Sequence, residues 1–213
     1  MAPALNHVSV IATDIEASRR FYVDELGLEP LPTPNFGFPV LWLCAGDCQL
    51  HLFERPGKPP SHAHFALEIT EFMPVYQRMK ELGALDHVTF GNAMYELPDG
   101  GIQMYVRDPA GNLVELDHRD AATIPRDEVP EYMSLADVNP QEGEAARATL
   151  WHLRRTVQEP GEAWHLRCSQ AQRSTQRENR TRPSACISLI EARKSASSRS
   201  RPPGPSTASA EAT

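Results

Sequence analysis

The chain has 213 residues, enough for one domain of ordinary size with an additional tail. It carries 21 Lys and Arg against 28 Asp and Glu, a formal net charge of −7, which argues against a nucleic-acid role for its core. It holds no apolar run of about 18 residues, so no membrane span is predicted. The first residues show neither a basic region nor an apolar stretch typical of a secretory signal. We therefore expect a cytoplasmic protein whose four cysteines are reduced.

The charge is divided unevenly along the chain. Residues 1–144 carry 9 basic and 23 acidic residues, whereas residues 145–213 carry 12 and 5. The later region is rich in Arg, Ser, Ala, Glu and Pro and has no sustained hydrophobic periodicity. We therefore predict a disordered basic tail over 151–213, preceded by a C-terminal arm over 119–150. Such a tail could bind nucleic acid or an acidic partner, but it lacks interleaved aromatic residues, so a solvated extension is preferred.

An internal repeat organises the first part of the chain. The stretches HVSVIATDIEASRRFYVDELG, from His7, and HFALEITEFMPVYQRMKELG, from His64, both open with the apolar alternation of a strand. Both continue with a helical pattern that ends at Leu-Gly. Gly27 and Gly83 stand where a left-handed residue closes a helix.

Short strands are expected after each helix. In the first copy Asp14 is expected to cap the helix, and in the second copy Thr70. The strands that follow are predicted over 28–31, 40–43 and 49–53 in the first copy, and over 88–90, 102–106 and 113–116 in the second. The stretch 93–97 is a further candidate strand in the second copy.

Each copy therefore has the element order β-α-β-β-β. One copy alone cannot bury the face of its sheet, whereas two copies can form one curved mixed sheet with a shared concave side. The sequence predicts an α+β fold of two tandem βαβββ modules, about 5–54 and 62–118, within a domain that spans residues 4–118.

Four polar side chains are expected on this concave side. The repeat pairs His7 with His64 and His51 with Glu115, and each alternates with apolar residues that face the helices. A lone strand histidine is more often a hydrogen-bonded core residue, but four symmetry-matched positions favour a metal. Three imidazoles and a carboxylate suit a divalent ion, which could be Fe2+, Ni2+, Zn2+ or Mn2+.

The aromatic residues of the first copy allow two interpretations. Phe36, Phe38, Trp42 and Phe53 could wall a hydrophobic substrate or fill the core, and core filling is favoured for Trp42. Arg107 and Arg55 are candidates for binding an anionic group, with a solvated charge as the default for both.

These stretches resemble a known family. HVSVIATDIEASRRFYVDELGLEPL, HAHFALEI and YVRDPAGNLVEL together are similar to the vicinal oxygen chelate superfamily over about residues 4–118. That superfamily includes glyoxalase I, methylmalonyl-CoA epimerase, extradiol dioxygenases, and the fosfomycin and bleomycin resistance proteins. The resemblance implies that His7, His64 and Glu115 match metal-ligand positions. It implies that His51 stands where glyoxalase I-like members carry Glu and epimerases carry Gln. It also implies a small-molecule substrate and a homodimer that builds its site from both chains.

Three activities are compatible with this resemblance. The preferred one is metal-dependent lyase or isomerase chemistry of the glyoxalase I kind on a small vicinal-oxygen substrate, with His51 or Glu96 as the base. The second is Fe(II) extradiol cleavage of a catechol, which MYVRDPAGNLVE favours, with Tyr105 as a hydroxyl near the metal. The acid/base histidine expected upstream is absent in that case. The third is the binding of an antibiotic or another small molecule, as in resistance proteins.

Overall fold

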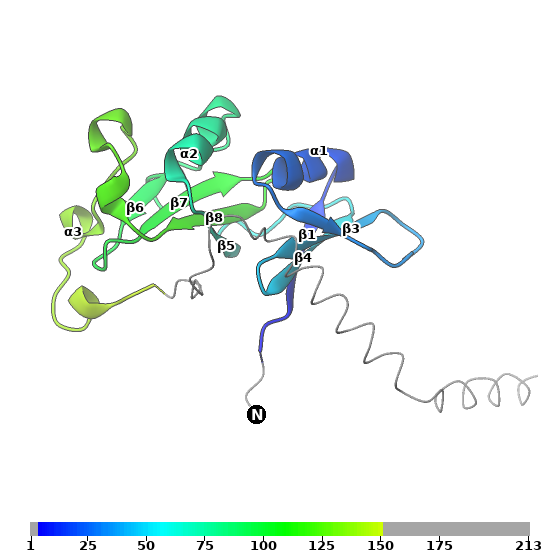
Figure 1. Cartoon of the computed structure of the whole chain (residues 1–213), viewed down its shortest axis with the longest axis horizontal. Helices are drawn as coiled ribbons and strands as arrows, with labels where there is room; N and C mark the ends of the chain where they lie inside the picture. The colour runs from blue at the N-terminus through cyan, green and yellow to red at the C-terminus, as the bar shows by residue number, and fades with distance from the viewer. Residues whose placement is uncertain (1–3, 151–213) are drawn as a thin grey trace, which may run out of the picture. The chain divides into compact units, whose positions relative to one another are not determined.

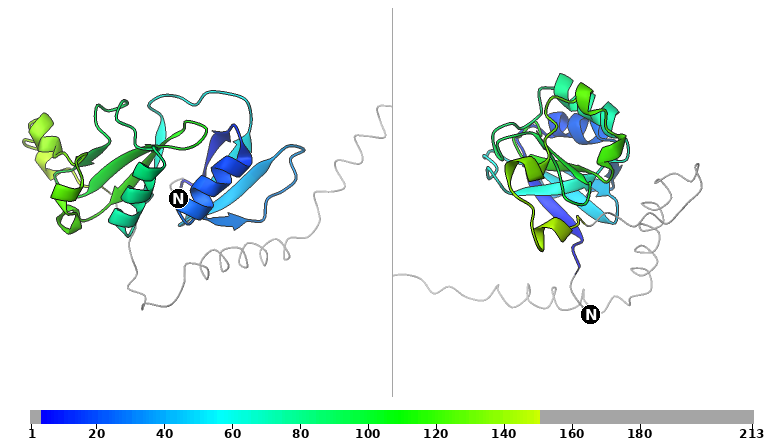
Figure 2. Two further views of the ribbon diagram at one scale, coloured as in Figure 1. Left: turned by 90° about the horizontal axis from the view of Figure 1, so that it is seen from above. Right: turned by 90° about the vertical axis from the view of Figure 1, so that its left-hand side faces the viewer.

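The computed structural model describes residues 4–150. The tail predicted for 151–213 lies outside these residues, as do Cys168 and Cys186. Within the described part the chain has the predicted α+β fold of tandem βαβββ modules (Figures 1 and 2). Cys48 is a free thiol, as expected, but Cys44 is disulfide-bonded, so the expectation of a reduced thiol is wrong at that position.

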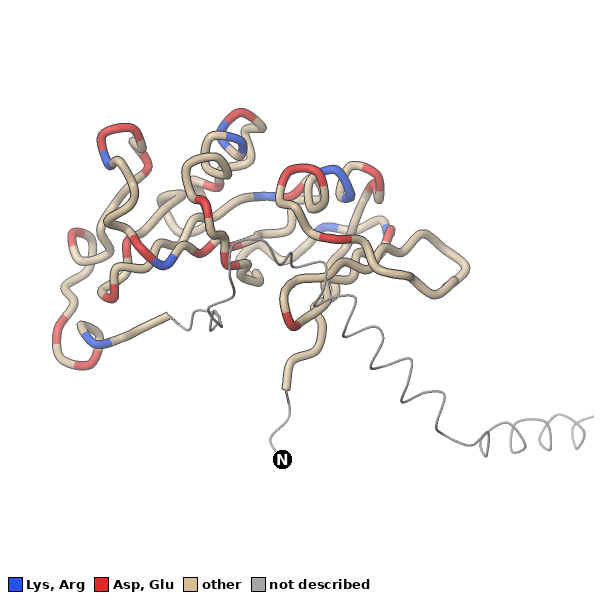
Figure 3. Tube along the Cα trace, in the orientation of Figure 1, with Lys and Arg blue, Asp and Glu red and all other residues tan. Residues whose placement is uncertain are grey.

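The first module is a mixed sheet covered by one helical segment. Asp14 caps this segment as predicted, since its carboxylate accepts from the Ala17 amide at 2.9 Å. The strands lie in the order β1-β4-β3-β2, with β1 parallel to β4. Between Glu29 and Asp47 the chain carries no charged residue (Figure 3). The elements are β1 (His7–Ala12), α1 (Ile15–Arg19), a π-helical continuation η1 (Arg20–Glu25), β2 (Glu29–Leu31), β3 (Val40–Ala45) and β4 (Cys48–Glu54).

The second module repeats this topology in the order β5-β8-β7-β6. Its elements are β5 (His64–Glu68), α2 (Phe72–Glu81), β6 (Met94–Glu96), β7 (Ile102–Arg107) and β8 (Leu113–His118).

Two local predictions in this module are wrong. Thr70 does not cap α2, because the residue at the N-cap position is Glu71, whose side chain makes no capping bond. Residues 88–90 are not a strand. The carboxylate of Asp86 accepts hydrogen bonds from the Val88 and Thr89 amides at 2.9 and 2.7 Å, which bends the backbone into a loop.

Strand register confirms the repeat inferred from the sequence. In the first sheet Trp42 of β3 lies opposite His51 of β4, and in the second sheet Tyr105 of β7 lies opposite Glu115 of β8. His51 and Glu115 therefore occupy equivalent places. Trp42 is the structural counterpart of Tyr105, and the sequence did not indicate this relationship.

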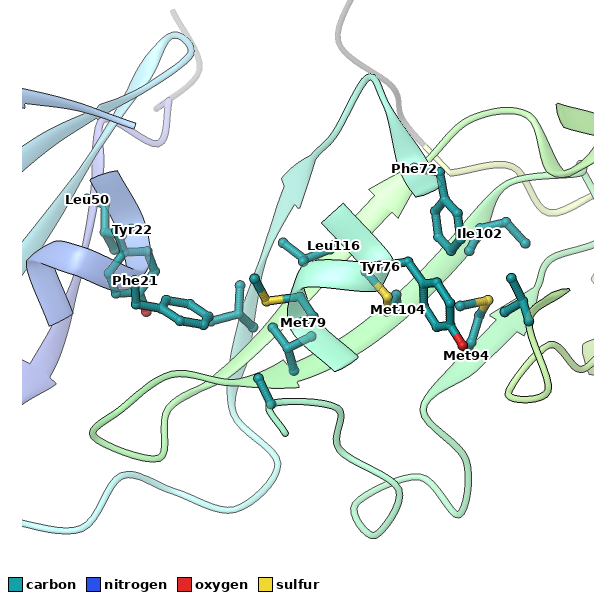
Figure 4. Packing of buried hydrophobic residues seen from close by; sticks show 14 of the residues in the cluster. Phe21, Tyr22, Leu50, Phe72, Tyr76, Met79, Met94, Ile102, Met104 and Leu116 are labelled. Carbon is teal, nitrogen blue, oxygen red and sulfur yellow. The ribbon is translucent and has the colours of Figure 1, made fainter. Parts of the chain in front are cut away.

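Each helix covers one face of its own sheet (Figures 1 and 2). In the second module buried residues of α2, β7 and β8 belong to one hydrophobic cluster. Fully burying a large apolar side chain there contributes roughly 1.5–3 kcal/mol. The polar side chains discussed below lie on the opposite face. The buried residues labelled in Figure 4 for this module are Phe72, Tyr76, Met79, Met94, Ile102, Met104 and Leu116.

The two sheets are joined by side chains rather than by strand pairing. Strands β1 and β5 are sheet edges that do not pair with each other, so two four-stranded sheets form where one continuous sheet was expected. The Tyr22 hydroxyl donates to the Asp108 carboxylate at 2.8 Å. The Asn112 amide donates to Asp108 and to the Ile11 carbonyl, both at 2.7 Å. The turn DPAGN thus links the second module to the first.

The C-terminal arm packs on the second module. The Glu96 amide donates to the Met133 carbonyl at 2.8 Å, and Ala121, Ile124 and Val129 are buried in the core. Among residues 4–150, no helix has the length and apolar character needed to span a bilayer. The short helical elements of the arm are η2 (Ala121–Thr123), η3 (Arg126–Glu128), α3 (Leu135–Val138) and η4 (Ala145–Arg147).

Candidate metal centre

His64 and Glu115 form a close pair on neighbouring strands of the second module. The Nε2 atom of His64 lies 3.2 Å from Oε2 of Glu115. The Nδ1 atom of His64 lies 2.9 Å from the His62 carbonyl oxygen. Because a carbonyl can only accept, Nδ1 carries the proton and Nε2 is the ring atom left to bind a metal.

Glu115 is held on its other side by a glutamine. Its side chain is buried, and Gln103 donates from Nε2 to Oε1 of Glu115 at 2.8 Å. The Tyr105 hydroxyl in turn donates to Oε1 of Gln103 at 3.3 Å. One carboxylate oxygen is therefore fixed by Gln103 while the other faces His64. Sequence reasoning missed Gln103, although its spacing of two residues from Tyr105 places it on the same strand face.

Burial alters the protonation of two further groups on this face. Burial, together with the charge of Glu115, raises the pKa of Tyr105 further above neutral pH, which favours the protonated hydroxyl. Burial and the nearby carboxylates of Glu115 and Glu68 raise the pKa of Asp117 to about 8. Sequence reasoning also missed Asp117, which follows Glu115 by two residues in LVELD and so shares its face.

His7 and His51 form the matching pair on the first module. Their rings stack with centroids 4.4 Å apart and planes at 17°. His7 contacts Oδ1 of Asn6 through Nδ1 at 2.6 Å, and His51 contacts Oε1 of Gln49 through Nε2 at 2.8 Å. Burial, and then the charge of His7, lower the pKa of His51. A neutral imidazole is the form that binds a metal or accepts a proton.

The four predicted ligands therefore lie as two pairs. In the part of the chain that the structure describes, no three His, Cys, Asp or Glu side chains are placed to hold one metal ion together. The donor chemistry of each pair fits a divalent transition metal. Each module supplies two ligands, and a four-ligand set requires a first-module pair and a second-module pair to meet.

Glu96 is not brought to this face. It lies opposite Ile102 in the sheet register and so points to the helix-covered side, away from Glu115. Its carboxylate accepts from the Tyr132 hydroxyl at 2.6 Å and from the Arg126 guanidinium at 3.0 Å. These contacts join β6 to the C-terminal arm.

Arg107 is bound within the protein. Its guanidinium pairs with the Asp86 carboxylate at 2.5 Å. It also donates to the Thr89 hydroxyl and to the carbonyls of Ser61 and Gly111. These bonds fix the loop that follows α2 and the loop that precedes β5, which explains why this strand residue is an arginine.

Trp42 lies on the site face, so the expectation that it fills the core is wrong. Its indole stacks on the His51 ring with centroids 4.3 Å apart and planes at 7°. Phe36 lies 6.0 Å from Trp42 and 6.3 Å from Phe53, measured between ring centroids. These three rings lie outside the main hydrophobic core cluster. With His7 and His51 they line a cavity of about 610 Å³.

The structure defines a protein of two tandem βαβββ modules, each a mixed four-stranded sheet with a helix on one face. The chain belongs to the Glyoxalase/Bleomycin resistance protein/Dioxygenase superfamily, whose family model matches residues 4–116. The resemblance stated from the sequence, to the vicinal oxygen chelate superfamily, is thereby confirmed.

Two curated proteins are similar to this chain. It is 28% identical over 134 residues to Glyoxylase I 4 of Arabidopsis thaliana, which covers 57% of this chain and 74% of that protein. It is 36% identical over 64 residues to the mitochondrial methylmalonyl-CoA epimerase of Bos taurus, or 29% of this chain and 37% of that protein. The crystal structure of a glyoxalase family protein from Bacillus anthracis aligns with a TM-score of 0.46 and 26% identity. That alignment covers 56% of this chain and 98% of the other.

Proposed function

We propose that this protein is a metal-dependent enzyme that carries out glyoxalase I-like lyase or isomerase chemistry on a small molecule with two neighbouring oxygen atoms. The observation that carries the proposal is the pair of His64 Nε2 and Glu115 Oε2 at 3.2 Å, each residue oriented by its own hydrogen bond. Similarity to Glyoxylase I 4 and to methylmalonyl-CoA epimerase supports the same class of chemistry.

The complete site forms in a homodimer. Each centre takes His7 and His51 from one copy and His64 and Glu115 from the other. Two observations support this arrangement. The two ligand pairs do not form a shared cluster within the described residues of one chain. Within residues 4–150, β1 and β5 are both sheet edges with a strand on one side alone, and such edges favour association with another chain.

A bound divalent ion would supply Lewis-acid activation of a substrate oxygen. The chain itself holds and moves protons. Nδ1 of His51 is the ring atom left to bind the ion or to accept a proton, because Nε2 contacts Gln49. The Tyr105 hydroxyl stays protonated and can donate a hydrogen bond to a substrate oxygen. Glu96 lies on the other face of the sheet, which argues against the base role considered from the sequence.

Extradiol cleavage of a catechol with Fe2+ is the second candidate. The Tyr105 ring lies edge-on to the His64 ring with centroids 5.9 Å apart, which favours a hydroxyl close to the ligand pair. The identity of the metal separates the two candidates. Nickel, zinc or manganese favours the lyase or isomerase, to be assayed with hemithioacetals and acyl-CoA esters. Iron favours the dioxygenase, to be assayed with catechols.

The decisive experiment combines two variants that are each defective in one half-site. His7→Ala/His51→Ala removes the first-module pair, and His64→Ala/Glu115→Gln removes the second. Elemental mass spectrometry of each variant alone is expected to find no bound metal. Unfolding and refolding the two together is expected to restore about one metal per mixed dimer, because one intact centre is rebuilt.

Other outcomes of this experiment contradict parts of the proposal. If the unmodified protein, purified without oxygen or chelator, contains no metal, the metal-dependent function is refuted. The remaining candidate is then a small-molecule-binding protein of the antibiotic-resistance kind. Metal in the unmodified protein with none recovered in the mixed dimers would place all four ligands within one chain.

A further inference from the structure

The cavity of the first module has an aromatic wall built from residues that the core does not use. Trp42, Phe36 and Phe53 face the cavity, and these rings lie outside the hydrophobic core cluster. The exposed fraction of Phe36 is 44%, a large value for an aromatic side chain. Core packing therefore does not account for this group of rings.

The wall is held in place by the loop between β2 and β3. The Thr33 hydroxyl accepts from the Trp42 amide at 3.0 Å and donates to the Leu31 carbonyl at 3.1 Å. The Asn35 side chain accepts from the Gly37 amide at 2.8 Å and so forms a tight turn around Phe36. A wall that is fixed before binding loses little entropy when a ligand arrives.

The charges around the cavity disfavour an anion. Among residues 4–150, the lining includes no Lys or Arg, and the one carboxylate in it is that of Asp47, on the β3–β4 turn. The segment that supplies Phe36 and Trp42 is uncharged throughout (Figure 3). The guanidinium of Arg55 stacks on the Phe38 ring, 3.9 Å from its centroid. Among the described lining residues, an anionic ligand would therefore meet the Asp47 carboxylate and no Lys or Arg side chain.

We propose that this cavity binds the uncharged, flat, aromatic part of the substrate, next to His7 and His51. Its volume of about 610 Å³ lies within the range of small-molecule sites. Rings of the wall offer stacked and edge-on contacts that a flat ring can use and a puckered saturated ring cannot. The assignment of this ligand as substrate rests on the proposed function, whereas the binding itself requires no metal.

The test compares three probes that differ in one property each. Isothermal titration calorimetry with chelator-treated protein would use 2-naphthol, the anion 2-naphthoate, and the saturated 2-decalol. We expect 2-naphthol to bind about tenfold more tightly than either of the others. Phe36→Leu is expected to weaken 2-naphthol about fivefold or more with unchanged circular dichroism, since Phe36 is half-exposed. Equal affinities for the three probes would overturn the proposal.

A charge reversal sharpens the test. Asp47→Lys is expected to raise the affinity for 2-naphthoate about fivefold or more and to leave 2-naphthol little changed. Glu16→Lys, on the exposed side of α1, makes the same change in net charge and is the matched control. An equal gain in both variants would show a non-specific charge effect and would contradict the proposal.

Binding of 2-naphthol by a protein that takes up no metal would support the binding role of the cavity and refute the metal-dependent function. Metal uptake without 2-naphthol binding would support the metal-dependent function and refute the binding of an aromatic group in the cavity.

Discussion

Nε2 of His64 lies 3.2 Å from Oε2 of Glu115, and hydrogen bonds within the protein orient both groups. The His62 carbonyl fixes the tautomer of His64, and Gln103 fixes the carboxylate of Glu115. Hydrogen bonds of this kind to metal-binding side chains raise affinity because the ligands need little rearrangement. In the proposed function this pair is half of the metal centre, and its hydrogen-bond partners are therefore testable parts of that proposal.

Gln103→Leu is expected to weaken metal binding by roughly 10- to 100-fold, the range for loss of a hydrogen bond to a ligand. The reason is that Oε1 of Glu115 loses its donor and the buried carboxylate is no longer held. Metal affinity would be measured by competition with a chromogenic chelator. Gln77→Leu, the same change at an exposed position of α2, is the matched control. Unchanged affinity in Gln103→Leu would show that Glu115 is not a ligand or that Gln103 does not orient it.

Tyr22→Phe is expected to destabilise the fold by about 1–3 kcal/mol, the cost of removing one partner of a buried hydrogen bond. The Tyr22 hydroxyl donates to Asp108, which is 4% exposed, and this contact links the two modules. Equilibrium unfolding in urea would give the free energy. Asp108→Asn and the double variant complete a mutant cycle. Strictly additive effects would mean that the hydroxyl and the carboxylate contribute independently, contrary to this account.

The alternation of polar and apolar residues was sufficient to predict the faces of the strands. Val8 and Leu50 pack toward the core, while His7 and His51 face the other side, as period-2 geometry requires. The sequence repeat placed His51 and Glu115 at equivalent positions because insertions between the copies are confined to loops. The fold and the pairing of these side chains on one face were therefore predictable from the sequence, whereas their role as metal ligands stays a prediction.

Other features could not be read from the sequence because they depend on register or on packing between elements. Glu96 is adjacent to Tyr95, and a shift of one residue in the position of β6 exchanges the faces of the two side chains. Trp42 was expected in the core because large aromatic residues usually are, and only the register opposite His51 reveals its place. The lack of hydrogen-bond pairing between β1 and β5 likewise depends on how the two complete sheets pack, which a strand pattern does not encode.

Glu96→Gln is expected to leave metal content unchanged and to destabilise the second module by about 1 kcal/mol. Its carboxylate binds Tyr132 and Arg126 of the C-terminal arm, on the face opposite Glu115. Metal would be measured by elemental mass spectrometry and stability by urea unfolding. Tyr132→Phe, which removes one donor to the same carboxylate, is expected to give a similar loss of stability. Loss of activity in Glu96→Gln with unchanged stability would contradict this structural role and would support Glu96 as the catalytic base.

Asp86 is expected to make part of the protein's stability depend on acid pH. Burial alone would raise its pKa, but hydrogen bonds from the Thr89 amide, Arg107 and the Val88 amide outweigh burial and lower the pKa to about 2. An unfolded chain has an Asp pKa of about 3.9. Because the folded pKa is the lower one, the contribution is complete well above pH 4 and is lost as the pH falls toward 2. The expected loss between pH 5 and pH 3 is about 1 kcal/mol.

The measurement compares the unmodified protein with Asp86→Asn by urea unfolding at pH 5 and pH 3. The asparagine cannot ionise, so the variant is expected to be less stable at pH 5 and to lose about 1 kcal/mol less than the parent on acidification. Asp137→Asn, at an exposed position of α3, is the matched control and should show no such difference from the parent. An identical loss in the parent and in Asp86→Asn would contradict this assignment. The loop that Asp86 and Arg107 hold together would then owe its order to other contacts.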